Sequence, residues 1–248
     1  MIKLNLPARP IELTDELTLE LTNQYIRDNS DVWNRKFIRD AVLAFSHNKC
    51  CYTECRLNSE SKYMEVDHFH PKIHFPKDVV RWGNLLPSCK KSNTTKGELN
   101  TKLYPIVNPL VDSPKDHLYI KNFRFYHKSI IGRRTIDYTA LNDRKHFVGK
   151  RFKIGMKVIE IIEEIRLNLE PLCIDVFSNE LQIKRLLNSY KNLLAEAKRE
   201  EEYSATISTI ILSDDNNNIL LNILAENDLL DDELEAFYHE LEYCSLID

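Results

Sequence analysis

The helical periodicity of this sequence is lost at residue 49 and returns only from about residue 142. Before that point, residues 11–27 and 30–46 place apolar side chains at the spacing of amphipathic helices. The segment 49–102 is rich in Cys, His, Asn and Lys and has no such spacing. Helical spacing then returns in four segments: 144–169, 178–201, 204–225 and 230–244. The chain therefore predicts a small irregular module set among helices.

Finer signals predict where elements begin and end. Residues 29–31 (Asn-Ser-Asp) are typical of a cap for the second helix. Residues 117–137 predict short strands with a turn at Gly132, and residues 216–218 (Asn-Asn-Asn) predict a loop. We expect an α+β fold in which a ββα module is embedded among helices and followed by an α-helical C-terminal part. The expected division is N-terminal helices at 1–47, the module with short strands at 48–140, and a helical region at 141–248.

Composition narrows the class of protein. The chain is 43% hydrophobic and can bury a core, and its 5 Gly argue against a glycine-rich phosphate loop. Its apolar runs are far shorter than the roughly 20 residues that a membrane span requires. The N-terminal residues contain no apolar core of the kind that a secretory signal needs. We expect a cytoplasmic protein without a membrane partner.

The net charge of −4 conceals a strong asymmetry. Residues 62–102 hold eight Lys and Arg against four Asp and Glu, and residues 115–154 hold eleven against three. From residue 196 to the end, fifteen acidic residues face two basic ones. A basic middle predicts a nucleic-acid surface, whereas acidic helices would repel phosphate and favour a protein partner. Solvated helix faces that carry no partner remain an alternative for both regions.

Two segments combine the residue types that phosphodiester hydrolysis needs: EVDHFHPK at 65–72 and WGNLLPSCKKSNTTKG at 82–97. A neutral imidazole such as His68 can take the proton of an attacking water. A hard divalent cation must meet the charge that develops on the phosphate, and Asp67 and Asn93 supply oxygen ligands for it. The spacing predicts a strand, a loop, a second strand and a short helix, with Asp67 and His68 at a strand end or in a loop.

These two segments resemble the signature of HNH (His-Asn-His, ββα-metal) endonucleases. With the downstream patterns NPLVDSP at 108–114 and LNDR at 141–144, they are similar more narrowly to HNH effectors of Septu-type and retron-associated antiviral systems. The resemblance covers roughly residues 48–150. It implies a hydrolase that cleaves DNA, or RNA such as tRNA, in antiphage defence. It also implies an ATPase partner similar to ABC or SMC proteins, and possible association with a retron reverse transcriptase and its RNA–DNA product.

Carried over residue by residue, the resemblance implies His68 as general base and Asn84 as the middle Asn that braces the loop. It implies Asp67 and Asn93 as ligands of Mg²⁺ or Mn²⁺. Four lysines are candidates for contact with phosphate: Lys72, Lys90, Lys91 and Lys96. For the adjacent pair Lys90 and Lys91, a solvated turn is the alternative.

Many HNH proteins hold a structural zinc between two Cys-x-x-Cys pairs, and this chain departs from that pattern. Thr53 and Ser92 stand where the second Cys of each pair would be. Four cysteines remain near the module: Cys50, Cys51, Cys55 and Cys89. Cys55 could replace the missing ligand through a wider Cys51-x-x-x-Cys55 turn, which with Cys89 gives three thiolates and no clear fourth ligand. That is weak support for a closed tetrahedral site, so a structural zinc is doubtful.

Two other functions remain open from the sequence. One is a catalytically inactive adaptor that binds nucleic acid, which the altered cysteine pairs favour slightly and the intact Asp67, His68 and Asn93 disfavour. The other is a stand-alone restriction-type nuclease, which the acidic tail disfavours. The target, DNA or RNA, also stays open, because both share the phosphodiester.

Overall fold

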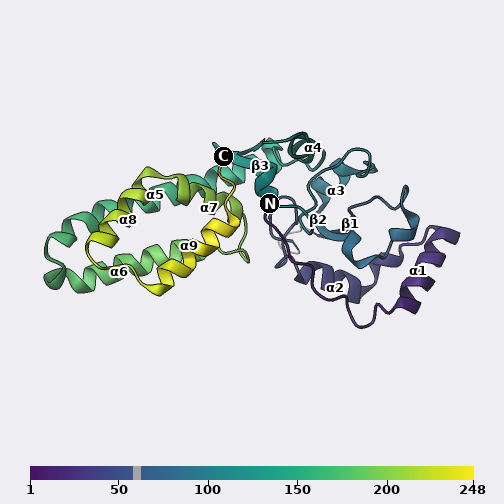
Figure 1. Cartoon of the computed structure of the whole chain (residues 1–248), viewed down its shortest axis with the longest axis horizontal. Coiled ribbons are helices and arrows are strands. Elements are labelled where there is room, and N and C mark those ends of the chain that lie inside the picture. Colours follow the sequence, from purple (N-terminus) through teal and green to yellow (C-terminus); the bar gives the residue numbers. More distant parts are fainter. Residues whose placement is uncertain (58–62) are drawn as a thin grey trace. The chain divides into compact units, whose positions relative to one another are not determined.

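The computed structural model describes residues 1–57 and 63–248, which form two compact units. Apart from the first two residues, the first unit contains residues 3–118 and 125–143, and the second contains residues 119–124 and 144–248. Helices and two small antiparallel sheets make up the chain (Figure 1). The expected α+β class with a helical C-terminal part is therefore confirmed.

The first unit opens with α1 (Asp15–Asp28), the 3-10 turn Val32–Asn34 and α2 (Lys36–Ala44). The expected cap of the second helix at residues 29–31 is wrong. Asn29 instead ends α1 with a left-handed φ of 54°, and Arg35 precedes α2 without a capping side chain. Asn is one of the few residues that adopts this conformation at low cost, so the same residue type serves either end of a helix.

The interrupted segment folds in the expected order of strand, loop, strand and helix. β1 (Met64–His68) pairs antiparallel with β2 (Leu85–Cys89), and α3 (Lys90–Lys96) follows β2 directly. Two 3-10 turns shape the intervening loop, Pro76–Asp78 and Trp82–Asn84. The β1–β2–α3 module is thus a ββα unit built from only 17 residues of regular structure.

A hydrophobic core joins this module to the N-terminal helices. Trp82 is buried in it, packs edge-to-face on Phe45 at 5.8 Å, and donates its indole N–H to the carbonyl of Pro7. The buried members come from the segment before α1, α1, the 3-10 turn Val32–Asn34, α2, the loop and β2: Leu13, Leu21, Tyr25, Val32, Ile38, Val42, Val79, Val80, Trp82 and Leu85. The helices therefore supply a core that a ββα unit of this size lacks alone.

The expected turn at Gly132 is wrong. After the 3-10 turn Pro114–Asp116, the hairpin of β3 (Leu118–Lys121) and β4 (Arg124–His127) turns at residues 122–123, whose φ values are 49° and 64°. Gly132 lies inside the next helix, α4 (Ile130–Tyr138). Two consecutive positive φ values are typical of the two-residue turns that match the twist of a hairpin.

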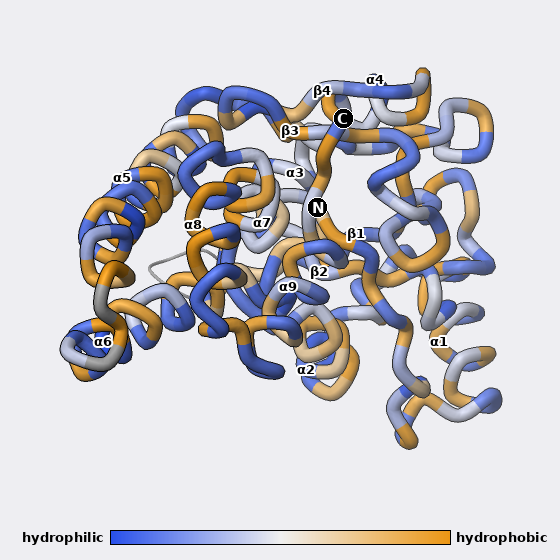
Figure 2. The backbone as a smooth tube through the Cα atoms, turned by 60° about the vertical axis from the view of Figure 1, so that its left-hand side comes forward, coloured by the Kyte–Doolittle hydropathy of each residue, from blue (hydrophilic) through white to orange (hydrophobic). Residues whose placement is uncertain are grey.

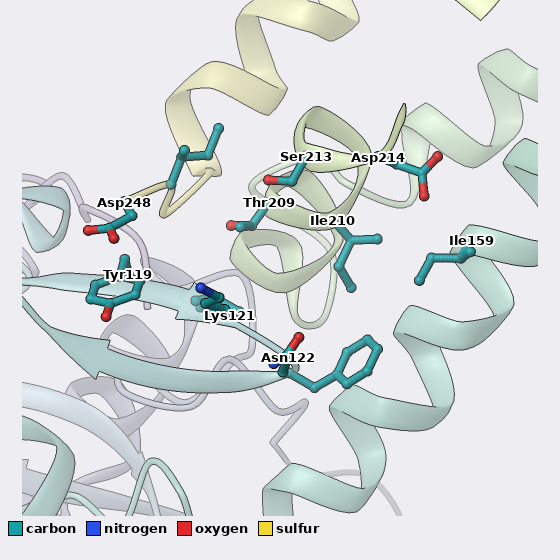
Figure 3. A pocket seen from close by; sticks show the side chains of 12 residues that line it. Tyr119, Lys121, Asn122, Ile159, Thr209, Ile210, Ser213, Asp214 and Asp248 are labelled. Carbon is teal, nitrogen blue, oxygen red and sulfur yellow. The ribbon is translucent and has the colours of Figure 1, made fainter. Parts of the chain in front are cut away.

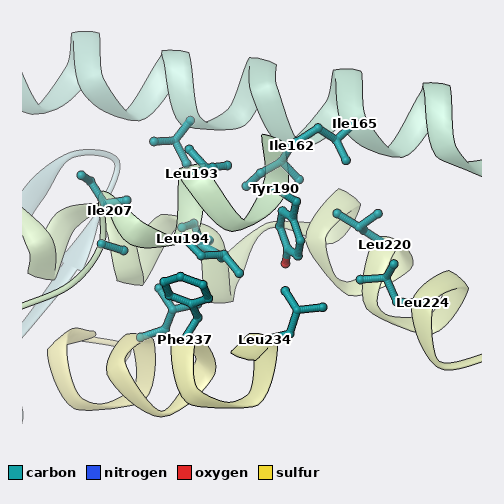
Figure 4. Packing of buried hydrophobic residues seen from close by; sticks show 14 of the residues in the cluster. Ile162, Ile165, Tyr190, Leu193, Leu194, Ile207, Leu220, Leu224, Leu234 and Phe237 are labelled. Atoms are coloured by element: carbon teal, nitrogen blue, oxygen red, sulfur yellow. The ribbon is translucent and has the colours of Figure 1, made fainter. Parts of the chain in front are cut away.

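The second unit is helical, and its described elements are a π turn at Arg144–Val148, α5 (Gly149–Leu172), a 3-10 turn at Cys173–Asp175, α6 (Val176–Ala195), α7 (Ser204–Ser213), α8 (Asp215–Glu226) and α9 (Asp232–Cys244). Hydrophobic residues recur along these helices (Figure 2) and meet in one core around Tyr190, Leu220 and Phe237 (Figure 4). Among the described residues, no helix is long and apolar enough to cross a membrane.

The expected loop at residues 216–218 is also wrong, because these residues belong to the first turn of α8. Asp214 caps that helix by accepting from the Asn217 N–H. The Asn217 side chain is fully buried and bonds the hydroxyls of Tyr190, at 2.6 Å, and Tyr238. A polar triplet suggests a loop, but here tertiary partners satisfy its buried amide.

The hairpin tip also lines a pocket in the second unit (Figure 3). Asn122 and Phe123 from the tip face Ile159 of α5 and Ile210 of α7 across a volume of about 410 Å³. The lining is mainly apolar, and Asp214 at its rim is engaged as the cap of α8. Tyr119, Lys121 and Asp248 add ionisable groups to the lining.

Gly132 permits close packing against backbone, and its replacement tests that packing. A Cβ at Gly132 would lie 2.0 Å from the carbonyl oxygen of His117, whereas a Cβ at Gly149 would lie 3.6 Å from the carbonyl oxygen of Arg144. We expect Gly132→Ala to lower the free energy of unfolding by about 2–3 kcal/mol, despite its gain in helix propensity. Gly149→Ala should be neutral or slightly stabilising. Denaturant unfolding measures both, and a Gly132→Ala variant as stable as wild type would contradict the packing.

Candidate active site

The β1–β2–α3 module brings most of the expected site residues to one pocket. His68 is the last residue of β1, opposite Leu85, and Asp67 lies opposite Leu86. The pocket has a volume of about 240 Å³, and α3 contributes Asn93 to it. Its lining residues are Tyr25, Asn29, Val66, Asp67, His68, Pro71, Lys72, Ile73, Asn93, Gly97 and Glu98. The proposed base, both proposed metal ligands and one proposed phosphate contact therefore share one cavity.

The ring of His68 is held by a single backbone acceptor. Its Nε2 lies 2.8 Å from the carbonyl oxygen of Val79. Because a carbonyl oxygen only accepts, Nε2 carries the hydrogen and Nδ1 of the neutral ring keeps its lone pair. Burial lowers the pKa of His68 to about 4, which outweighs the opposing effects of the Val79 bond and the Asp67 charge. The ring is therefore neutral near pH 7 and has an acceptor nitrogen available for a proton.

This depressed pKa has a consequence for stability in acid. The unfolded chain takes up a proton on His68 near its usual pKa, whereas the folded protein resists it down to about pH 4. Below the usual pKa of histidine, the unfolded state binds more protons than the folded state does. The free energy of unfolding therefore decreases as the pH is lowered. In a buffer that contains a metal chelator, we compare the free energy of unfolding at about pH 7 and about pH 5. We expect it to decrease by about 2 kcal/mol more in wild type than in His68→Gln. Urea unfolding at both pH values measures this difference.

A matched control is His239→Gln, which removes a histidine that is 72% exposed in its side chain. That variant should show the same pH dependence as wild type. Equal acid losses in wild type and His68→Gln would contradict a neutral, buried His68.

Asn84 fastens the loop that carries the His68 acceptor. It is fully buried, and its Oδ1 accepts from the His70 N–H at 2.8 Å. Its Nδ2 donates to the carbonyls of His70 and Asp78, at 3.1 and 3.0 Å. Asp78 directly precedes Val79, so the side chain of Asn84 fixes the backbone that in turn holds His68. The catalytic importance of Asn84 stays a prediction, with these three hydrogen bonds as its structural basis.

Asp67 is a buried carboxylate with two strong donors. Its Oδ1 accepts from the Lys96 ammonium at 2.7 Å, and its Oδ2 accepts from the Tyr52 hydroxyl at 2.7 Å. Burial, followed by the charge of Asp67, raises the pKa of Tyr52, so this hydroxyl remains a donor. A carboxylate offers about four lone-pair positions, so both oxygens retain capacity for a cation.

The expected role of Lys96 as a phosphate contact is corrected by its position. Its side chain is only 1% exposed, and its ammonium bonds Asp67 and the carbonyl of His68, each at 2.7 Å. A buried ammonium with two acceptors on β1 cannot also reach a phosphate at the surface. Lys96 instead ties α3 to β1 and compensates the charge of Asp67.

Asn93 presents an oxygen to the same pocket. Its Nδ2 donates to the Glu65 carboxylate at 2.8 Å, which fixes the side-chain amide and leaves Oδ1 as an acceptor. Asp67 and Asn93 therefore offer two hard oxygen donors, the type and small number that Mg²⁺ prefers when waters and phosphate complete its shell. Within residues 1–57 and 63–248, no three His, Cys, Asp or Glu side chains are arranged to hold a metal. A cation here would depend on the amide of Asn93 and on ligands from outside the chain.

The other proposed phosphate contacts occupy different places. Lys72 lines the pocket, and its ammonium lies over the ring of Trp33, 4.5 Å from the centroid. Lys90 is exposed at the start of α3, outside the pocket lining. Lys91 follows it and forms an ion pair of 3.3 Å with Asp143. Of Lys72, Lys90 and Lys91, therefore, Lys72 alone lines the pocket with His68.

The four clustered cysteines lie together, with the Cys50 sulfur in contact with Cys51, Cys55 and Cys89, and two hydroxyls join them. Thr53 donates to the Cys55 sulfur at 3.3 Å, and Cys89 donates to the Ser92 hydroxyl at 3.4 Å. Contact with the Cys50 sulfur raises the pKa of Cys89 to about 11, so its thiol remains a donor. The two hydroxyls at the altered positions thus bond the remaining sulfurs directly.

The sequence did not indicate several residues of this site. Tyr52 and Trp33 lie outside the motif segments, and only their tertiary contacts reveal them. Glu65 carried a usable signal, because it lies two residues before Asp67 on a strand and therefore on the same face. Tyr25 reaches the pocket from α1, far from the motif in sequence.

Sequence comparison identifies a relative over most of the chain. Septu protein PtuB of Bacillus thuringiensis is 39% identical over 215 residues, which cover 87% of this chain and 83% of that protein. The chain belongs to the Septu PtuB family. No protein-family profile and no solved structure matches it. The expected relation to Septu-type proteins is confirmed, whereas the nuclease activity stays a prediction.

Proposed function

We propose that this member of the Septu PtuB family is a metal-dependent HNH endonuclease that acts in antiphage defence. The observation that carries the proposal is the pocket in which Asp67, His68 and Asn93 meet at the end of β1 and on α3. The neutral His68 ring, with Nδ1 unprotonated, suits it to accept the proton of a water that attacks phosphorus.

Each residue has a distinct task in this proposal. His68 takes the water proton at Nδ1 as the water oxygen bonds to phosphorus and the bond to the leaving ribose oxygen breaks. Lys72 binds a phosphate oxygen at the pocket wall. Asp67 and Asn93 would hold Mg²⁺ or Mn²⁺, which when bound neutralises charge on the phosphate and the leaving oxygen. Asn84 keeps the Val79 carbonyl, and hence the His68 ring, in place.

A partner protein is part of the same proposal. The relative carries the name of the Septu system, and the resemblance in sequence implies an ATPase that works with the nuclease. The second unit offers acidic helices for such a contact. Some of their charge is satisfied internally, because Arg199 pairs with Glu240, and Lys191 pairs with Asp231 and Glu233.

Cleavage of labelled nucleic acids tests the activity. Purified protein, alone and with an ATPase encoded beside it, is incubated with duplex DNA, single-stranded DNA or total tRNA in Mg²⁺ or Mn²⁺. We expect cleavage that EDTA abolishes and that His68→Ala slows by about a hundredfold or more, because the general base is lost. The substrate that is cut distinguishes DNA from RNA.

The control for this experiment is His239→Ala, an exposed histidine of the second unit, which should cleave like wild type. Absence of cleavage in every lane, with the partner present, would contradict the proposal. It would favour the alternative of an inactive nucleic-acid-binding adaptor.

Metal binding at Asp67 has a test that needs no activity. Lys96→Met leaves a buried carboxylate without its counter-charge, which should cost about 3 kcal/mol of stability in EDTA. If Asp67 holds a cation, Mg²⁺ should restore much of this loss and raise the Tm of Lys96→Met more than that of wild type. The double variant Asp67→Asn/Lys96→Met is the control and should not respond. Equal effects of Mg²⁺ on all three proteins would argue against metal at Asp67.

A further inference from the structure

One indole ring contacts both proposed catalytic groups of the pocket. The rings of Trp33 and His68 meet edge-to-face, with centroids 4.7 Å apart and planes at 89°. The Lys72 ammonium lies over the same indole, 4.5 Å from its centroid. Both neighbours line the pocket, whereas Trp33 lies behind them.

Trp33 is itself held by the N-terminal helices and not by the ββα module. It sits in the 3-10 turn Val32–Asn34 between α1 and α2, is half-buried, and packs against the hydrophobic core of the first unit. Tyr25 of α1 meets its ring edge-to-face at 6.0 Å. The position of the indole is therefore set by a segment that lies some thirty residues before the motif.

We propose that Trp33 is a positioning residue that fixes the His68 imidazole and the Lys72 ammonium relative to each other. This inference rests on the proposed function and extends its site to the N-terminal helices. The His68 ring is held at one nitrogen by Val79 and is contacted edge-to-face by the indole, so two contacts restrict its rotation. The electron-rich face of the indole attracts the ammonium, which restricts a long side chain that would otherwise sample many rotamers.

The indole contacts the neutral imidazole of His68 and the ammonium of Lys72 at the same time. Positioning of this kind matters because small displacements of reacting groups reduce rates strongly. Trp33 touches neither water nor phosphate in this scheme and acts only through its two neighbours.

Nuclear magnetic resonance on the metal-free full chain tests the proposal directly. In wild type we expect a single Nε2–H tautomer of His68 in imidazole ¹⁵N spectra, and upfield-shifted Lys72 ε-methylene protons from the indole ring current. Trp33→Leu should give mixed tautomers and lose the upfield shift. Trp33→Phe, which keeps an aromatic face, should retain both signals. Difference spectra of His68→Gln and Lys72→Met assign the resonances.

Trp82→Phe is the matched control, because Trp82 is the other of the two tryptophans and lies in the same core. It should leave both signals unchanged. If nuclease activity is present, Trp33→Leu should lower kcat about tenfold and raise KM, and Trp33→Phe should restore most of both.

Either of two results overturns the inference: unchanged tautomer and ring-current signals in Trp33→Leu, or absence of the upfield Lys72 shift in wild type. The measurement of the Lys72 shift uses the wild-type protein, so it does not depend on whether a variant folds. Failure of every substrate to be cleaved, with the spectra as expected, would remove the proposed function and leave the positioning contacts intact. The two proposals can therefore fail separately.

Discussion

The buried pair of Asp67 and Lys96 joins β1 and α3, the two elements that carry Asp67, His68 and Asn93. Both side chains are almost fully buried, and the ammonium also bonds the backbone of His68, so α3 is tied to the end of β1 at two points. Burying two charges is costly, and it is tolerated here because each charged atom finds a close partner, with Tyr52 completing the set. Loss of one partner would leave a charge without compensation in the core. The geometry of His68 and Asn93 depends on this junction, because one follows Asp67 and the other precedes Lys96 by less than one helical turn.

The second constraint is how a very small ββα module is kept folded. In this chain the two altered cysteine positions carry Thr53 and Ser92, whose hydroxyls bond the remaining sulfurs. The hydrophobic core adds support, since α1 and α2 pack against the loop and β2. The N-terminal helices therefore do more than flank the module. They supply Tyr25 and Trp33, which form or support a wall of the pocket.

Membership of the Septu PtuB family and the pocket chemistry bear on different questions. The relative spans most of both chains and shows the family, but its name does not specify a reaction. The reaction is inferred from a neutral imidazole beside two oxygen donors, an arrangement suited to phosphodiester hydrolysis. The acidic helices of the second unit are a separate feature, with a polar network around Asn217 in their core.

The sequence by itself determined the class of fold, the order of β1, β2 and α3, and the convergence of Asp67, His68 and Asn93, because these follow from local patterns and short spacings. The predictions were wrong at positions whose residue type is common in two kinds of local structure. Asn29 ends a helix rather than starting one, Gly132 packs against backbone rather than forming a turn, and residues 216–218 enter a helix because a buried partner satisfies Asn217. Only the tertiary structure decided that Lys96 neutralises Asp67 and that Trp33 stands behind His68 and Lys72. Such contacts join segments distant in the chain, and burial and partner geometry, which no local pattern records, select them.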